Sequence, residues 1–386
     1  MWIAALFSSE LGTAVLAFAI TWTASGYGAD TAAAVFTLTV TPPVLFGLLG
    51  GALADRFGPR KIMVASCAGM ATTAATSAVI AATAGVVPAL LLVTATSIGT
   101  AGAFFRPSST VFARHFVADD ELGTAMVRAG MAGQLARSIG PPLGGMLLGV
   151  LSLTGAAWLA AAGATAALLT LLMIHPPRRH HSAYDAATAR GIADAVVAAR
   201  SRRGVPALLA AVAIVAGVVI PVVVLGIPVI ARERGWSAIE AGLIEAGWIA
   251  GGLFCSALFA WRGPASKAWR PMFTGPGIIV LGLELLAMTP LWIVAMSSTV
   301  LVGAGVITFT AHAFPTYTLL APSAMVSRFH SLLLLVQQAP QLLMTPLIGL
   351  FVASTGTGPA IAAFGMIPAY ASLVVARNRR LREFRL

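Results

Sequence analysis

The sequence predicts an all-α membrane protein with twelve transmembrane helices, arranged as two six-helix halves around a central cavity. Three observations lead to this prediction: an apolar composition, regularly spaced apolar runs, and positive charge confined to alternate loops. Of the 386 residues, 58% are hydrophobic and 10% are charged, whereas a soluble domain carries about 25% charged residues. Most of the chain must therefore face lipid rather than water.

The apolar runs have the length of membrane spans. A helix needs about 20 apolar residues to cross a hydrocarbon layer about 30 Å thick, and runs of this length follow one another along the chain with short polar turns between them. The expected helices cover residues 2–24, 31–54, 61–83, 88–113, 123–149, 153–174, 205–230, 237–261, 271–289, 291–319, 324–353 and 358–376.

One long basic segment divides the chain. Residues 175–204 contain six arginines and a short amphipathic stretch around 192–199. We expect an N-terminal six-helix half at 1–174, this segment as a cytoplasmic linker, a C-terminal six-helix half at 205–376, and a basic cytoplasmic tail at 377–386.

A faint internal repeat supports two equivalent halves. Residues 140–144 (GPPLG) are similar to residues 345–349 (TPLIG), and each stretch lies in the fifth expected helix of its half. Two such halves around a cavity at the membrane midplane are typical of transporters.

The net charge of +11 is a signal of topology. Of 24 Lys and Arg residues, only Arg232 and Arg234 fall in loops on the side that we expect to be outside. This bias matches the positive-inside rule, so we expect a multi-pass protein of the cell (plasma or inner) membrane with both termini in the cytoplasm. Nucleic acid is not an expected partner.

The chain carries no signature of an enzyme or of a cofactor site. The two cysteines, Cys67 and Cys255, lie in apolar runs without the spacing of metal ligands. No glycine-rich loop with Lys-Ser/Thr is present to hold a nucleotide. We therefore expect no metal, no cofactor and no direct use of ATP, with a proton gradient as the energy source.

A short polar loop joins the second and third expected helices at residues 50–61 (GGALADRFGPRK). Glycine at 58 permits the positive φ of a tight turn, and the aspartate is an anion placed to meet a helix N-terminus or neighbouring guanidinium groups. The residues that form the motif are Gly51, Asp55, Arg56, Gly58, Arg60 and Lys61.

This loop resembles the loop signature of the major facilitator superfamily. It lies between the second and third helices, as in the family, and the chain has the family's helix count. The resemblance implies a gating role, in which Asp55 latches the two halves by facing the start of the 324–353 helix near Pro322 and Ser323. Pro59 stands where the family usually has a basic residue. The alternative is a positively charged turn that only sets topology.

Residues 136–145 (ARSIGPPLGG) resemble the fifth-helix signature of exporters in the same family. Small residues four apart allow another helix to approach closely, and Gly-Pro bends the helix. The resemblance favours export over import. By this motif the chain is similar to drug–proton antiporters and to siderophore (enterobactin-type) and macrolide exporters. Ordinary membrane packing is the alternative. The motif residues are Gly140, Pro141, Gly144 and Gly145.

Three ionisable residues inside expected spans are candidates for coupling. Each costs at least about 2.5–3.5 kcal/mol at the centre of a membrane helix, so each calls for a reason. Arg137 and Glu245 lie at similar depth and form an expected ion pair, either switching with access state or static. Glu10 has no cation in its own helix and is an expected proton site, or else a permanently protonated structural group.

Further polar residues are candidates for lining the cavity. The amides are able to orient a substrate, and the basic groups to attract one. The family's usual fourth-helix arginine is replaced by Ala95, which the resemblance links to altered or absent proton coupling. The candidates are Gln134, Arg106, His312, Gln337 and Gln341.

Together, these residues predict a transporter that exports small amphiphilic, drug- or siderophore-like molecules by alternating access, coupled to proton influx. Its expected partners are the substrate, protons and the lipid bilayer, and we expect a monomer. The alternative in the same fold is an uncoupled facilitator or a proton-coupled importer of a small metabolite. A membrane sensor or membrane-embedded enzyme is disfavoured, since the chain has neither a sizeable extramembrane domain nor a nucleophile–base set.

Overall fold

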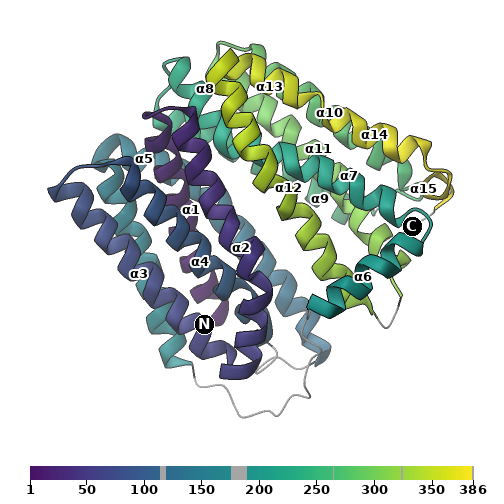
Figure 1. Ribbon diagram of the computed structural model, residues 1–386, viewed down its shortest axis with the longest axis horizontal. Helices are drawn as coiled ribbons and strands as arrows, with labels where there is room; N and C mark the ends of the chain where they lie inside the picture. The colour runs from purple at the N-terminus through teal and green to yellow at the C-terminus, as the bar shows by residue number, and fades with distance from the viewer. Residues whose placement is uncertain (114–118, 175–188, 264, 323–324, 385–386) are drawn as a thin grey trace. The chain divides into compact units, whose positions relative to one another are not determined.

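The computed structural model describes residues 1–113, 119–174, 189–263, 265–322 and 325–384, and every regular element in these ranges is helical (Figure 1). The predicted all-α membrane fold is confirmed. The first elements are α1 (Trp2–Ser25), α2 (Ala29–Phe57), α3 (Pro59–Thr83), α4 (Pro88–Ala113) and α5 (Asp119–Met173). The later elements are α6 (Ala189–Ser201), α7 (Val205–Pro221), the π-helix η1 (Val222–Gly226), α8 (Ile227–Glu233), α9 (Ala238–Arg262), α10 (Trp269–Met288), α11 (Trp292–Leu320), α12 (Val326–Thr355), α13 (Thr357–Gly365), α14 (Pro368–Arg377) and α15 (Arg379–Glu383).

Within these ranges, eleven segments are long and apolar enough to cross a membrane. One of them, Arg128–Met173, has 46 residues, or about 69 Å at 1.5 Å per residue, which is enough for two crossings. It bends at Ser152, whose φ of 57° and ψ of −165° are not helical. This segment therefore corresponds to the two helices expected at 123–149 and 153–174.

Proline accounts for the breaks within two other spans. The span Val205–Glu233 runs through α7, η1 and α8, and its π-helical turn begins directly after Pro221, which cannot donate a helical hydrogen bond. The span Thr357–Arg377 is divided into α13 and α14 before Pro368. Each of these two breaks lies within one span that the sequence predicts.

The described chain forms two compact units. The first comprises Met1–Tyr27, Ala34–Thr188 and Ser237–Gly242, so far as these are described. The second comprises Gly28–Ala33, Ala189–Trp236 and Leu243–Leu386, with the same restriction. The division cuts α2 and α9 near their N-terminal ends.

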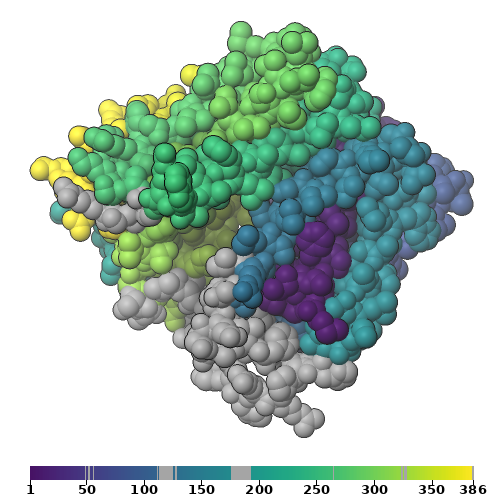
Figure 2. All heavy atoms as spheres, turned by 180° about the vertical axis from the view of Figure 1, so that it is seen from behind, coloured from purple at the N-terminus to yellow at the C-terminus, as the bar shows by residue number. Residues whose placement is uncertain are grey.

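In the first unit, α1 packs against both arms of α5. A Cβ on Gly140, in the first arm, would stand 2.4 Å from the Ala14 Cβ, and one on Gly12 would stand 3.0 Å from the Ala160 carbonyl oxygen in the second arm. Figure 2 shows the purple atoms of α1 bordered by blue and teal atoms of α5. The small residues make this close approach of backbones possible.

A buried apolar cluster fixes the N-terminal end of α1 to its neighbours. It includes Trp2, Met63, Cys67 and Phe112, from α1, α3 and α4. Trp2 donates its indole Nε1–H to Ser109 Oγ at 3.2 Å, which satisfies the polar atom of an otherwise apolar side chain. This packing places Glu10, two turns further along α1, at a fixed position among α3, α4 and α5.

In the second unit, α6 is the amphipathic helix expected around 192–199. Ala195 and Ala199 are buried, whereas Val197 and Arg200 are exposed. Asp194 faces α12, where its Oδ2 atom lies 3.7 Å from Arg328 Nη1. The N-terminal part of the basic segment, residues 175–188, lies outside the described residues.

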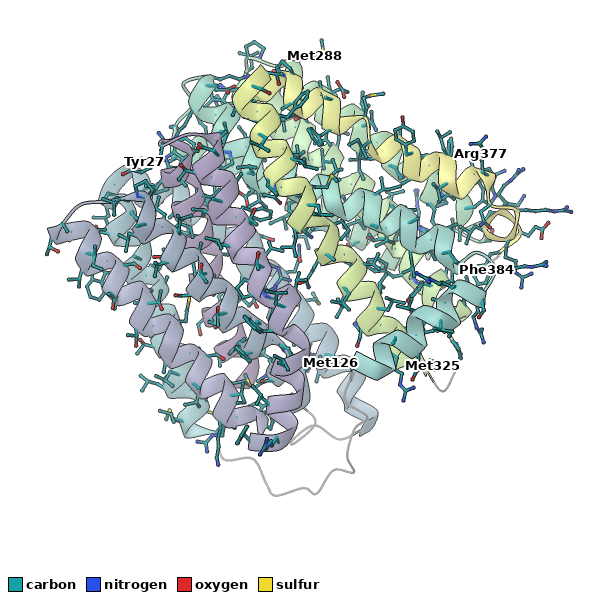
Figure 3. All side chains as sticks on the ribbon, viewed as in Figure 1. Tyr27, Met126, Met288, Met325, Arg377 and Phe384 are labelled. Carbon is teal, nitrogen blue, oxygen red and sulfur yellow. The ribbon has the colours of Figure 1, made fainter. Side chains whose placement is uncertain are left out.

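Charged side chains close two helix ends of the second unit. The Glu233 carboxylate accepts from the backbone N–H of Thr357 at 3.3 Å and from its hydroxyl at 2.6 Å, at the start of α13. Arg234 donates to the carbonyl oxygens of Leu286 and Ala287 near the end of α10, close to Met288, which is labelled in Figure 3. Both contacts satisfy backbone groups that helix ends leave unpaired.

Candidate functional site

Three charged side chains meet inside the first unit. Glu10 of α1 accepts two hydrogen bonds from Arg106 of α4, from Nε to Oε1 at 3.1 Å and from Nη2 to Oε2 at 3.2 Å. Arg137 of α5 donates from Nη1 to Glu10 Oε2 at 3.0 Å and from Nη2 to Gln134 Oε1 at 3.3 Å. One carboxylate is thus held by guanidinium groups from two other helices. We call Glu10, Arg106 and Arg137 the charge cluster.

The helices bring these residues together because their depths match. Glu10 lies eight residues after the first residue of α1, and Arg106 lies seven residues before the last residue of α4. These separations correspond to about 12 Å and about 10 Å along the helix axes. Since consecutive spans run in opposite directions, α1 begins on the side of the membrane where α4 ends.

The cluster keeps one positive charge in excess, since two arginines face one carboxylate. The Glu10 side chain is 8% exposed, whereas the side chains of Arg106 and Arg137 are 57% and 43% exposed. The Glu10 carboxylate is therefore enclosed within the unit, whereas both guanidinium groups keep N–H donors that are accessible. Such a group attracts anions and planar oxygen acceptors.

A small cavity of about 30 Å³ borders Glu10, Arg106 and Thr13. Its volume is comparable to the space that one water molecule occupies. This cavity is therefore too small to hold a substrate molecule beside Glu10.

The structure bears on two expectations about this cluster. The sequence offers no cation in the helix of Glu10 itself, and in the structure two arginines from other helices bind its carboxylate. Arg137 binds Glu10 within its own unit, while its expected pair with Glu245, which belongs to the second unit, stays a prediction. Depth alone predicts which residues share a membrane level, and it does not predict which helices are neighbours.

Glu245 of α9 is buried in the second unit. The residue is 8% exposed, and its Oε2 atom is buried without a hydrogen-bond partner among the described residues. An ionised carboxylate in this position would be costly. Glu245 therefore stays a candidate for coupling, as the sequence predicts.

The other cavity candidates bond mainly to backbone. Gln341 donates to the Gln337 carbonyl oxygen at 2.7 Å, and Gln337 donates to the Leu333 carbonyl oxygen at 3.4 Å. His312 is fully buried, with Nδ1 3.0 Å from the Thr308 carbonyl oxygen and Nε2 accepting from the Ala265 N–H at 3.0 Å. These bonds fix the tautomer with hydrogen on Nδ1 and leave the ring no free nitrogen for a ligand.

In the gating motif, Gly58 has the expected positive φ, at 90°. Arg60 donates to the carbonyl oxygens of Leu171 and Leu172 at 2.9 and 2.7 Å, so it closes the C-terminal end of α5. Sequence reasoning assigned no such contact to it. Arg56 and Lys61 of the same motif are exposed. The structure does not describe the surroundings of Gly51, the side chain of Asp55, or the expected facing residue Ser323.

In the exporter-like motif, the glycines are contact points. Gly140 packs against Ala14, and Gly144 packs against Val15 and Phe18, all of α1. Gly145 packs against Ala238, in the short segment of α9 that groups with the first unit. Pro141 lies inside α5. The predicted close helix approach at the small-residue stripe is confirmed, and α1 is its partner.

The apolar spans and the charged residues held within them define a multi-pass membrane transporter rather than an enzyme. Residues 2–345 match the family model described as Major Facilitator Superfamily. The chain belongs to the Major Facilitator Superfamily, and as a member of it binds small-molecule substrates. No curated protein matches the chain significantly in sequence.

Solved structures of several transporters share the fold. A bacterial homologue of the human lysosomal transporter Spinster, in an inward-facing and occupied conformation, is 16% identical with a TM-score of 0.74, covering 98% of this chain and 96% of that one. A nucleoside transporter is 12% identical with a TM-score of 0.74, covering 98% and 99%. A D-xylose–proton symporter is 15% identical with a TM-score of 0.72, covering 97% and 96%. At these identities the likeness concerns the fold alone.

Proposed function

We propose that this chain exports small amphiphilic molecules, drug- or siderophore-like, across the cell membrane by alternating access, coupled to proton influx. In this proposal it acts as a monomer with both termini in the cytoplasm. The observation that carries the proposal is Glu245, a buried carboxyl group inside a membrane span with one oxygen that has no hydrogen-bond partner in the described part of the chain.

The proton and the substrate act on Glu245 in opposite senses. Where the site is sealed from water, an unpaired carboxylate is costly and the neutral form is favoured. Where the site opens to water, the group releases its proton, and the resulting carboxylate attracts a cationic or polar substrate. Because a ligand drives a conformational change only by binding the two states differently, exchange of proton for substrate at Glu245 produces antiport. The motif at residues 136–145 supports the outward direction of substrate movement by its likeness to exporters.

The charge cluster favours a second candidate function, proton-coupled uptake of an anion. If Glu10 takes up a proton, Arg106 and Arg137 lose their carboxylate partner and are free to bind an anionic group of a substrate. Proton and anion then bind together, which is the logic of symport rather than antiport.

Proteoliposomes with a pH gradient separate these candidates without regard to the orientation of the protein. The membrane potential is clamped, and the probes are a quaternary ammonium dye and a membrane-impermeant carboxylate dye, with protein-free liposomes as the blank. Proton antiport accumulates the cationic dye in vesicles that are acid inside. Symport accumulates the carboxylate dye when the acid side is outside, and an uncoupled facilitator accumulates neither.

In the same assay we expect Glu245→Gln to abolish accumulation driven by the gradient while downhill exchange of the dye persists. For one proton per monovalent cation and a gradient of one pH unit, accumulation falls from about 10-fold to about 1-fold. Glu240→Gln is the matched control, because glutamine preserves the capping box that Glu240 forms with Ser237 at the start of α9. Unchanged accumulation in Glu245→Gln would rule out the proposed proton site.

A further inference from the structure

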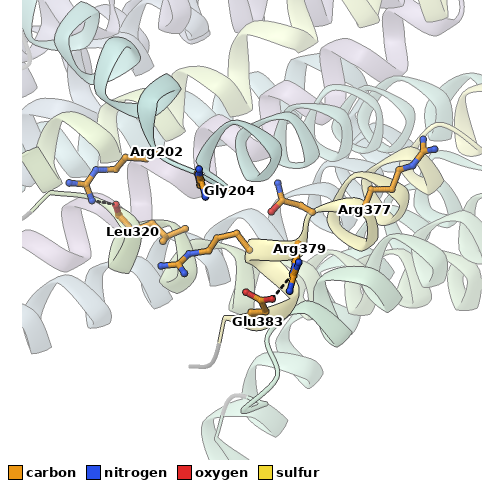
Figure 4. Close-up of a pocket in the computed structure, with 9 residues that line it drawn as sticks. Arg202, Gly204, Leu320, Arg377, Arg379 and Glu383 are labelled. Atoms are coloured by element: carbon orange, nitrogen blue, oxygen red, sulfur yellow. Dashed lines mark hydrogen bonds and ion pairs between the residues drawn. The ribbon is translucent and has the colours of Figure 1, made fainter.

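A basic pocket lies at the end of the second unit where its C-terminal tail folds back. Its volume is about 890 Å³. Arginines line it from two places, the turn before α7 and the segment from the end of α14 to α15 (Figure 4). The charged residues that line it are Arg202, Arg203, Arg377, Arg379, Arg380 and Glu383.

Apolar packing holds the tail in place beside this pocket. Leu381 of α15 is fully buried, and its Cδ2 atom lies 3.4 Å from the position of a Cβ on Gly204, which has a φ of 93°. The Asn378 side chain accepts from the Leu381 N–H at 3.2 Å and closes the start of α15. Arg382 lies over the Trp269 ring at 5.7 Å. Figure 3 labels Arg377 and Phe384 on either side of this docked segment.

The pocket has more positive charge than its own groups neutralise. Arg202 donates to the Leu320 carbonyl oxygen at 2.9 Å, and Arg379 donates to the Glu383 carboxylate at 2.9 Å (Figure 4). Among the described residues, Arg203, Arg377 and Arg380 have no hydrogen-bond or ion-pair partner. Five arginines and one glutamate leave a formal charge of +4 on the lining.

The position of the pocket indicates what kind of anion reaches it. Three membrane spans end at this pocket: two end at its lining residues Leu320 and Arg377, and the third begins at Val205, directly after the lining residue Gly204. The lining therefore lies at the boundary between hydrocarbon and water, where the phosphate groups of lipids are found. Guanidinium groups bind phosphate oxygens in pairs of parallel hydrogen bonds, and basic residues at this level attract anionic lipid.

We propose that this pocket is a binding site for a phosphate group, supplied either by the headgroup of an anionic phospholipid or by a soluble phosphate. Arg203 and Arg380 are its principal ligands, because they come from the two different segments of the lining and neither is engaged elsewhere in the described chain. The site is independent of the proposed transport reaction.

Native mass spectrometry of the full-length purified protein tests this proposal. The protein is released from detergent after incubation with phosphatidylglycerol, with phosphatidylcholine, or with inorganic phosphate as a competitor. We expect retention of phosphatidylglycerol over phosphatidylcholine in the wild type. In Arg203→Gln/Arg380→Gln we expect retention to fall about 30-fold, since each basic residue at the membrane surface contributes about 1 kcal/mol.

Arg262→Gln/Lys267→Gln is the control, because it removes two positive charges outside the pocket lining, one from the last residue of α9 and one from the segment between α9 and α10. Displacement of the lipid by inorganic phosphate, or binding of phosphate alone, identifies a soluble phosphate as a source, and lipid retention without such competition identifies the headgroup.

Arg203→Lys/Arg380→Lys keeps the charges and is expected to retain most binding. Equal loss in the control variant, or equal retention of both lipids by the wild type, would overturn the proposal. Melting temperatures of all variants in detergent separate loss of binding from loss of folding.

Discussion

At the scale of single residues, Glu10 is bound more firmly than its position in an apolar helix suggests. Its two carboxylate oxygens accept three hydrogen bonds from two guanidinium groups. Each hydrogen bond to a charged group contributes about 1.5–3 kcal/mol to stability. Loss of the carboxylate would leave the two guanidinium groups without their acceptor. Glu10 is thus a structural anchor for α4 and α5 as well as a candidate for coupling.

We expect Glu10→Gln to destabilise the protein by about 2 kcal/mol, because both arginines then repel each other without an intervening carboxylate. The measurement is the melting temperature in detergent. Adding Arg106→Gln restores the net charge of the cluster to +1, so the double variant should be less destabilised than the sum of the two single variants. Strict additivity in this double-mutant cycle would show that the two side chains are not coupled.

The pairing of Glu10 could not be predicted from the sequence, although all three residues were identified as candidates. Its partners are 96 and 127 residues away in the chain, and nothing in a single sequence states which helices touch. The depths of Glu10 and Arg106 did carry a usable signal, since both lie within about 12 Å of the same side of the membrane. Arg137 and Glu245 carry a similar signal, but they lie in different units, so their pairing stays a prediction.

At the scale of elements, α5 organises the first unit by enclosing α1 between its two arms. The approach depends on glycines whose hydrogen atoms face the α1 backbone. The sequence predicted this close packing because small residues four apart form one stripe along a helix. It also predicted the lengths of both arms, since the hydrocarbon thickness sets the length of every span.

We expect Gly140→Ala to destabilise the protein by about 1–3 kcal/mol, because the added Cβ would stand 2.4 Å from the Ala14 Cβ. Gly130→Ala in the same helix is the control. A Cβ there meets nothing within 4 Å, so the change should be neutral or stabilising by up to about 1 kcal/mol, the difference in helix propensity. Thermal unfolding in detergent measures both, and an equal effect would contradict the assigned packing.

At the scale of the whole molecule, we propose that the gating motif acts in switching between access states, as its resemblance to the family's loop signature implies. The turn has the expected positive φ at Gly58, and Arg60 closes the end of α5, a contact that the sequence did not predict. The proposed latch residue is Asp55.

We expect Asp55→Asn to slow exchange of the quaternary ammonium dye about tenfold or more while its equilibrium binding stays unchanged, because a weakened latch alters the balance of access states and leaves binding groups intact. Asp30→Asn, at the opposite end of α2, is the control. Transport rates in proteoliposomes and binding in detergent are compared. A protein that fails to insert in the membrane would assign the motif to topology instead.

The enclosure of α1 by α5 also constrains the order in which the protein is assembled during synthesis. The ribosome makes Glu10 first, and Arg137 follows 127 residues later, which takes roughly 6–25 s at about 5–20 residues per second. Until Arg106 is made, 96 residues after Glu10, α1 has a carboxyl group in an apolar span without either of its arginines. The first helix therefore has to remain next to the insertion machinery, or hold its carboxyl group protonated, until α4 and the first arm of α5 arrive to neutralise it.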